Sequence, residues 1–162
     1  MRRSAVAACC LTAILLLGPT FMAWPGSSSP SSSSGPKVTA RMLAMQKAKN
    51  LFECARKENP LLKWDDCLAR KAEQRARKMV RQDYFDHKDP KTERNPAWRM
   101  VKACYRCTYA GENLSKGEDT AEAIHQAWME STEHRENIEN PRYRLLGVGC
   151  FDAVCVQLFA GF

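Results

Sequence analysis

Apolar residues recur at helical spacing in two stretches of the chain after residue 37. The first stripe predicts a helix from about Thr39 to Lys57, which the Asn59-Pro60 pair ends. The second predicts a helix that begins after an Asp65 cap and carries Lys and Arg on its opposite face. Each helix therefore has one buried side. The apolar positions are Ala44, Met45, Ala48, Leu51, Phe52 and Ala55 in the first helix and Leu68, Ala69, Ala72, Ala76, Met79 and Val80 in the second.

The middle of the chain is less regular. The segment from Asp83 to Pro96 contains two prolines and many charges, which predicts a long loop with room for a short helix after Pro96. A third helix is predicted after Asp119, whose side chain can cap it while Glu122 reaches back as a capping box. The inner face of this helix carries Ala121, Ile124, Ala127, Trp128 and Ser131.

Two apolar runs near the end of the sequence, LLGVGCF and VCVQLFAGF, predict strands that are covered on both faces. A two-residue turn at Asp152 and Ala153 would join them as a hairpin. This register places Cys150 opposite Cys155, Gly147 opposite Leu158 and Gly149 opposite Val156. Helices before and after a buried sheet predict an α+β fold, a three-layer α-β-α sandwich with a short central antiparallel sheet.

The first 36 residues have a different composition. A charged tip, an apolar run from Ala5 to Gly18 and a small-residue exit are typical of a secretory signal in residues 1–26, with an uncleaved signal anchor as the alternative. Residues 27–36 form a Ser/Pro-rich linker, and residues 37–162 form one domain. The predicted localisation is therefore secreted or extracellular, with membrane contact only through an uncleaved leader.

The net charge does not by itself indicate a binding partner. The chain has 25 basic and 18 acidic residues, and setting aside Arg2 and Arg3 leaves a formal net charge of +5. Such a charge can attract anionic lipid, glycan or cell wall, but its spread over two helices without interleaved aromatic residues favours a role in solubility. No motif for binding nucleic acid is present.

Six cysteines follow the leader: Cys54, Cys67, Cys104, Cys107, Cys150 and Cys155. An even count in an exported domain predicts a disulfide framework, for which 15 connectivities exist. The hairpin register favours Cys150 with Cys155, and the corner between two helices favours Cys54 with Cys67, which leaves Cys104 with Cys107. The alternative is a zinc site built from Cys104, Cys107, Cys150 and Cys155.

Five segments, taken in order, resemble the CAP superfamily of cysteine-rich secretory proteins, antigen 5 and plant pathogenesis-related proteins, in a compact form common in bacteria. They are LKWDDCLARKAEQRARKM, YFDHKDP, AGENLSKG, AWMESTEHRENIENPRYRLLGVGC and VQLFAGF. The resemblance covers about residues 37–162 and implies an α-β-α sandwich whose central cleft is lined by His87, His134 and Glu112. Longer family members have a second glutamate where this chain has Ser131. The family's cleft set of two histidines and two glutamates is therefore incomplete here.

These residues allow three kinds of chemistry. His87, Glu112 in a tight turn and His134 could bind a divalent metal such as zinc, act as a general acid and base, or form a buried hydrogen-bond network, which we favour. No serine, cysteine or threonine has the context of a nucleophile. The preferred hypothesis is an extracellular binding or interaction module for a lipid, glycan, metal or protein that requires no cofactor. The alternative is a secreted, protease-like hydrolase that uses the same cleft.

Overall fold

A four-stranded mixed sheet forms the centre of the molecule in a computed structural model that describes residues 38–162. The strand order is β1-β3-β4-β2, with β1 at Lys63–Trp64, β2 at Tyr109–Lys116, β3 at Tyr143–Phe151 and β4 at Val154–Gly161. Strands β3, β4 and β2 are antiparallel, as expected, but β1 pairs in parallel with β3. The predicted leader and Ser/Pro linker lie outside the described residues.

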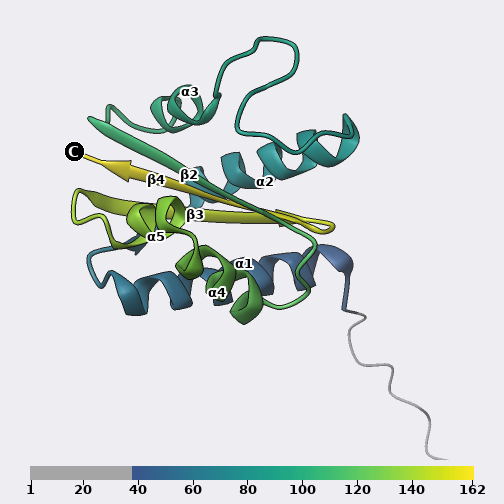
Figure 1. Cartoon of the computed structure of the whole chain (residues 1–162), viewed down its shortest axis with the longest axis horizontal. Coiled ribbons are helices and arrows are strands. Elements are labelled where there is room, and N and C mark those ends of the chain that lie inside the picture. Colours follow the sequence, from purple (N-terminus) through teal and green to yellow (C-terminus); the bar gives the residue numbers. More distant parts are fainter. Residues whose placement is uncertain (1–37) are drawn as a thin grey trace, which may run out of the picture. The chain divides into compact units, whose positions relative to one another are not determined.

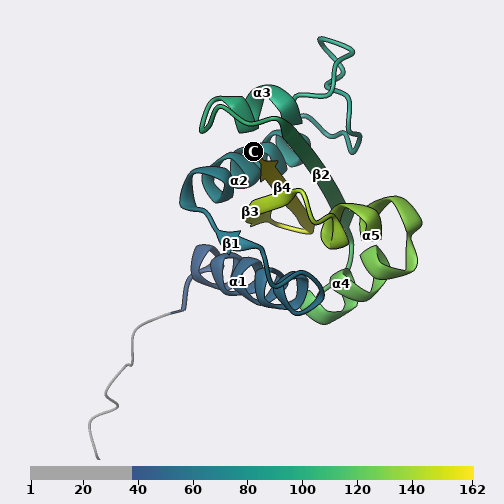
Figure 2. The same cartoon turned by 90° about the vertical axis from the view of Figure 1, so that its left-hand side faces the viewer.

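Helices cover both faces of this sheet. Helices α2 (Asp66–Arg81) and α3 (Ala97–Lys102) lie on one face, and α1 (Ala40–Glu58), α4 (Ala121–Glu130) and α5 (Thr132–Glu139) lie on the other (Figures 1 and 2). Each face has its own apolar cluster: Phe52, Trp128 and Phe159 belong to one, and Leu68 and Leu158 to the other. The predicted α-β-α sandwich is therefore confirmed. Within residues 38–162, no helix combines the length and apolarity that crossing a bilayer requires.

The central hairpin has the predicted register. Cys150 pairs with Cys155, Gly147 with Leu158 and Gly149 with Val156. The glycines let α2 approach the sheet closely, because a Cβ at Gly147 or Gly149 would lie 2.1 Å from a backbone nitrogen of that helix. Strand β3 thus requires glycine where α2 crosses it.

Two helix boundaries differ from the prediction. The N-cap of α4 is Thr120 rather than Asp119, because the Thr120 hydroxyl accepts a hydrogen bond from Ala123 N (3.1 Å). The predicted third helix also ends at Ser131, which has an extended backbone (φ −87°, ψ 122°) and begins the separate helix α5. Serine commonly occupies such boundaries, where its short polar side chain competes with helical hydrogen bonding.

The disulfides correct part of the predicted connectivity. Cys150 bonds to Cys155 as expected, but Cys67 bonds to Cys104, and the thiols of Cys54 and Cys107 are free in the described part of the chain. The predictions of Cys54 with Cys67 and of Cys104 with Cys107 are wrong. Cys54 lies on α1, and the sheet separates that helix from α2 and Cys67. With three of its four cysteines in disulfides, the alternative zinc site also has no support.

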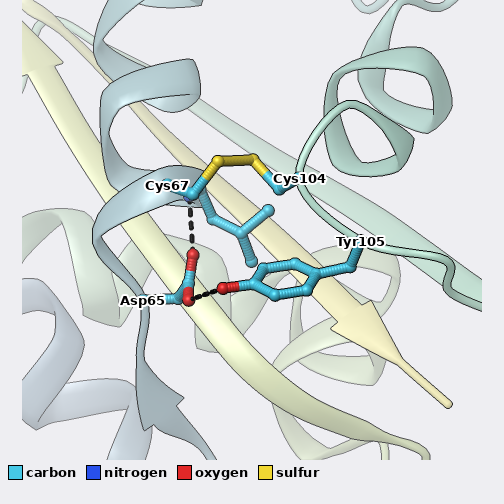
Figure 3. The surroundings of a disulfide bond; sticks show 5 residues. Asp65, Cys67, Cys104 and Tyr105 are labelled. Carbon is cyan, nitrogen blue, oxygen red and sulfur yellow. Dashed lines mark hydrogen bonds between the residues drawn. A yellow bond between two sulfur atoms is a disulfide. The ribbon is translucent and has the colours of Figure 1, made fainter.

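The Cys67–Cys104 bond joins the first turn of α2 to the segment after α3, across a sequence separation of 37. Asp65 lies beside it, as Figure 3 shows. One Asp65 oxygen accepts from Leu68 N (2.8 Å) and caps α2, and the other accepts from the Tyr105 hydroxyl (2.5 Å). The start of α2 is therefore tied to the chain after α3 by a covalent bond and a hydrogen bond.

Candidate functional site

Glu112 lies on strand β2 at the edge of the sheet, opposite Leu158 of β4, and not in the tight turn that the sequence suggested. Since side chains alternate along a strand, Glu112 shares a face with Leu114, which packs in the cluster beneath α2. Only 1% of its side chain is exposed. A carboxylate this deeply buried needs a charged or hydrogen-bonding partner.

Arg75 of α2 is that partner. Its Nε donates to Glu112 Oε2 at 3.2 Å, and both side chains are 1% exposed. Arg75 was not among the predicted site residues, because the basic residues of this helix were expected on its solvent side. The signal was available, because Arg75 follows Ala72 by three positions and precedes Met79 by four, which places it on the apolar stripe.

The remaining donors of Arg75 hold the start of the long loop. Nη1 donates to the Tyr84 hydroxyl (2.6 Å), and Nη2 donates to the carbonyl oxygens of Asp86 (2.6 Å) and His87 (3.0 Å). A guanidinium group suits this position because its planar set of donors can bond several acceptors at once. Arg75 therefore fixes residues 84–87 against α2 and β2.

His87 completes the contacts of Glu112. Its Nδ1 lies 2.9 Å from Glu112 Oε1, while 46% of its side chain is exposed. The hydrogen bond to Glu112 raises the pKa of His87 above its ordinary value, although burial and the charge of Arg75 act in the opposite direction. The imidazole is thus anchored at one nitrogen and open to solvent over much of its surface.

His134 lies in the first turn of α5, close enough for its charge to interact with that of His87. Burial lowers the pKa of His134, and repulsion from His87 lowers it further, while Glu133 acts in the opposite direction. The predicted histidines therefore come together, but they differ in electrostatic character. The pKa of His87 lies above the ordinary value of histidine, and that of His134 lies below it.

Asn113 connects α5 to the sheet. This fully buried side chain donates from Nδ2 to the His134 carbonyl oxygen and to Gln157 Oε1 (both 3.0 Å), and its Oδ1 accepts from Asn137 Nδ2 (2.9 Å). The residue therefore holds the backbone that carries His134.

The motifs that suggested a family all belong to one sandwich, in which they form α2, the long loop, β2, the segment from α4 to β3, and β4. The family model described as CAP, Cysteine-rich secretory protein family, matches residues 39–157. The chain belongs to this family. The CAP match covers both layers of helices and most of the central sheet.

Known relatives agree with the CAP assignment. The uncharacterized protein YkwD of Bacillus subtilis (strain 168) is 36% identical over 102 residues, which make up 62% of this chain and 39% of YkwD. The crystal structure of an extracellular protein containing a SCP domain, from Bacillus anthracis str. Ames, has 28% identity and a TM-score of 0.69, covering 80% of this chain and 45% of the other. The chain thus spans less than half the length of these two relatives.

A third similarity concerns the fold alone. An outer surface protein from Borrelia burgdorferi has 23% identity and a TM-score of 0.62, and the match covers 78% of this chain and 98% of that one. The matched fold therefore makes up nearly the whole compared chain.

Both Glu112 oxygens already bond Arg75 and His87. Among residues 38–162, no three His, Cys, Asp or Glu side chains are grouped so that they could hold a metal ion. The carboxylate of Glu112 thus has its charge balanced by Arg75 and a hydrogen bond to the imidazole of His87.

Three surface hollows border the helices. One, of about 230 Å³, lies between α1 and α2, and two others border α3. None of these three is lined by His87, Glu112 or His134, although Arg75 lines one of the hollows beside α3.

Proposed function

We propose that this CAP protein acts outside the cytoplasm as a binding or interaction module, in which the Arg75–Glu112–His87 network braces the surface that carries the histidines. One observation carries the proposal: both oxygens of Glu112 bond other protein groups, and 1% of the side chain is exposed. A general base must reach a substrate proton with an available oxygen. Glu112 instead supports residues 84–87.

The extracellular location rests on separate observations. Two disulfides form within 125 described residues, and such bonds persist in oxidising compartments. The related proteins from Bacillus anthracis and Borrelia burgdorferi are described as extracellular and as an outer surface protein. A signal in residues 1–26 would supply the route of export.

A lipid, glycan or protein ligand fits this proposal better than a metal ion. Two imidazoles provide half of a tetrahedral zinc shell, and the carboxylate between them is engaged. The hydrolase alternative lacks both a free acid and a nucleophile with a recognisable setting.

Purified domain can test the absence of catalysis. We expect wild type and His134→Ala to fold equally well and to show no hydrolysis of a mixed peptide library, with or without added zinc. Peptide cleavage that His134→Ala abolishes and His125→Ala preserves would overturn the proposal. His125 is a suitable control because it lies on α4 near Glu58 (3.6 Å), outside the network. Isothermal titration with zinc, run on the same samples, tests the metal hypothesis directly.

Export is tested with the full chain. We expect its product in the culture medium or on the cell surface, and mass mapping without reduction should find Cys67 bonded to Cys104 and Cys150 to Cys155. Accumulation of the reduced protein in the cytoplasm would contradict an extracellular role.

A further inference from the structure

Helices α2 and α3 enclose a groove of about 410 Å³ whose lining combines cations with apolar surface. Lys71 and Arg99 line it together with Pro96, Met100 and Ala103. A second hollow, of about 480 Å³, shares Pro96 and Arg99 with the first and extends to Arg94 and Trp98. The shared residues make the two hollows one extended concave surface around α3, which we call the α2/α3 groove.

The cations of the α2/α3 groove differ in how their charge is balanced. Arg75 pairs with Glu112, and Lys78 pairs with Asp89. By contrast, no carboxylate in residues 38–162 lies within ion-pair distance of Lys71, Arg94 or Arg99. The groove therefore presents three uncompensated positive charges, and a concave surface focuses their field.

Bonds at both ends hold the groove open. The Cys67–Cys104 disulfide ties the first turn of α2 to the segment after α3. At the other end, Lys78 near the end of α2 bonds Asp89, which is 4% exposed and whose second oxygen accepts from Lys91 N (3.0 Å). Because both walls are fixed before a ligand arrives, binding costs little conformational entropy.

Trp98 adds an aromatic surface. Its side chain is 42% exposed, it lines the second hollow, and the Lys102 ammonium lies 4.6 Å from its ring centre. Tryptophan presents a flat apolar face to a ligand and is common at binding surfaces. Cations beside an exposed indole match a ligand that carries both anionic groups and flat apolar ring faces.

We propose that the α2/α3 groove binds an anionic oligosaccharide, with its acidic groups on Lys71 and Arg99 and one sugar ring on Trp98. A bilayer fits less well, because these cations line a hollow that a flat headgroup surface does not enter. The α2/α3 groove contains neither His87 nor His134. Arg75 of the network also lines the groove, but its charge is paired with Glu112, so the proposed contacts with Lys71 and Arg99 are tested separately from the role assigned to the network.

Calorimetric titration of the purified domain tests the proposal with four probes. They are a galacturonate tetramer (carboxylate groups), a heparin tetrasaccharide (sulfate groups), neutral chitotetraose and phosphatidylglycerol vesicles. We expect at least one acidic tetrasaccharide to bind, more weakly as salt increases, while chitotetraose does not. The Lys71→Gln/Arg99→Gln double variant should bind about tenfold more weakly or worse, because two charge-assisted contacts are lost. Trp98→Ala should bind about threefold more weakly.

A charge-matched variant distinguishes binding in the α2/α3 groove from attraction by the net charge of the protein. Lys57→Gln/Lys116→Gln removes the same charge from exposed positions on α1 and β2 and should change affinity by less than about twofold at moderate salt. Equal losses in both double variants would show that net charge alone attracts the ligand. Absence of binding to both acidic tetrasaccharides, or vesicle binding that Lys71→Gln/Arg99→Gln abolishes, would overturn the proposal. Unchanged melting temperatures would show that each variant is folded.

Discussion

Glu112 and Asn113 are neighbours on β2, and their side chains serve opposite layers of the sandwich. Glu112 bonds Arg75 of α2 and His87 of the long loop, while Asn113 bonds the backbone of His134 in α5. Strand alternation makes this division possible, since adjacent residues point to opposite faces of the sheet. At the sheet edge the two histidines lie near enough to influence each other's protonation. Two residues of one strand thus position a site drawn from three other segments.

The Glu112–Arg75 pair should contribute strongly to stability. Glu112→Gln keeps the size of the side chain but leaves the buried Arg75 charge without a countercharge, which we expect to lower the free energy of unfolding by about 3 kcal/mol. Urea unfolding measures the loss. Glu53→Gln, which breaks the exposed Arg56–Glu53 pair, should cost less than about 1 kcal/mol. Similar small losses in both variants would mean that the buried pair is not a brace.

The two site histidines predict opposite dependences of stability on pH. The bond to Glu112 raises the pKa of His87. The stabilisation that protonated His87 gives the folded state is therefore complete below the ordinary pKa of 6.5 and is lost as pH rises through the raised pKa. Burial lowers the pKa of His134, so its contribution is complete above 6.5 and is lost as pH falls through the lowered pKa. The summed contribution of the two histidines to the free energy of unfolding is therefore greatest near pH 6.5.

Urea unfolding between about pH 5 and pH 8 separates these contributions. The difference in unfolding free energy between wild type and His87→Asn should shrink toward alkaline pH. The same difference for His134→Asn should shrink toward acid pH. His125→Asn serves as the control and should show neither trend. Trends of reversed sign would show that the two protonation preferences are wrongly assigned.

At the scale of elements, the position of α2 links the fold to both candidate sites. Its inner face packs on β3 where two glycines remove side chains, its Arg75 holds the long loop, and its outer flank forms one wall of the α2/α3 groove. A disulfide holds its first turn. Displacement of this helix would therefore disturb the histidine network and the groove together.

The Cys67–Cys104 bond should be a major source of stability. Cys67→Ala/Cys104→Ala removes a link that closes a long loop, and a chain-entropy estimate for the 37-residue separation gives a loss of about 4 kcal/mol. Cys54→Ala/Cys107→Ala also removes two sulfurs but breaks no bond, and should cost about 1 kcal/mol or less. Thermal and urea unfolding compare the two. Equal losses would contradict the connectivity described above.

The contact between α2 and β3 is tested at the glycines. In Gly149→Ala the new Cβ would lie 2.1 Å from the backbone nitrogen of Glu73, so α2 must move, with an expected loss of about 3 kcal/mol or more. Gly117→Ala meets no atom within 4 Å but must adopt a φ of 107°, which should cost about 1 kcal/mol. Urea unfolding that ranks Gly117→Ala as the more damaging change would show that α2 is not held tightly against the sheet.

At the scale of the whole molecule, stability and recognition occupy different regions. The β3–β4 hairpin is covered on both faces, and every residue of β4 is buried. The histidine site lies at the β2 edge, and the α2/α3 groove lies on one outer layer. Both proposed binding surfaces therefore lie at the periphery of the sheet, outside the buried β3–β4 hairpin.

Hydrogen exchange followed by mass spectrometry should reproduce this division. Backbone amides of β3 and β4 should exchange most slowly, and those of the exposed loop around Lys91 to Asn95 among the fastest in residues 38–162. Glu112→Gln should accelerate exchange in residues 84–87 more than in 150–155, because Arg75 then loses its fixed position. An equal increase in both segments would contradict a local brace.

Sequence alone determined the features that depend on neighbouring residues. Helical periodicity located α1 and α2, the Asp65 side chain marked the start of α2, and the two-residue turn established the Cys150–Cys155 register. The CAP motifs, in their order along the chain, identified the family and predicted that His87, Glu112 and His134 share one site. Each of these inferences rests on short-range geometry or on a resemblance along the chain.

Only the tertiary structure decided which partners distant residues find. Cys67 bonds Cys104 because α1 and α2 cover opposite faces of the sheet, and spacing along the chain carries no information about that side. Glu112 bonds Arg75 because β2 pairs with β4, on which α2 packs, and this contact converts a candidate acid into half of a buried ion pair. The groove between α2 and α3 likewise exists only once the disulfide and the Lys78–Asp89 bond bring its walls together. Sequence determines which groups are present, and packing determines which of them remain free to meet a ligand.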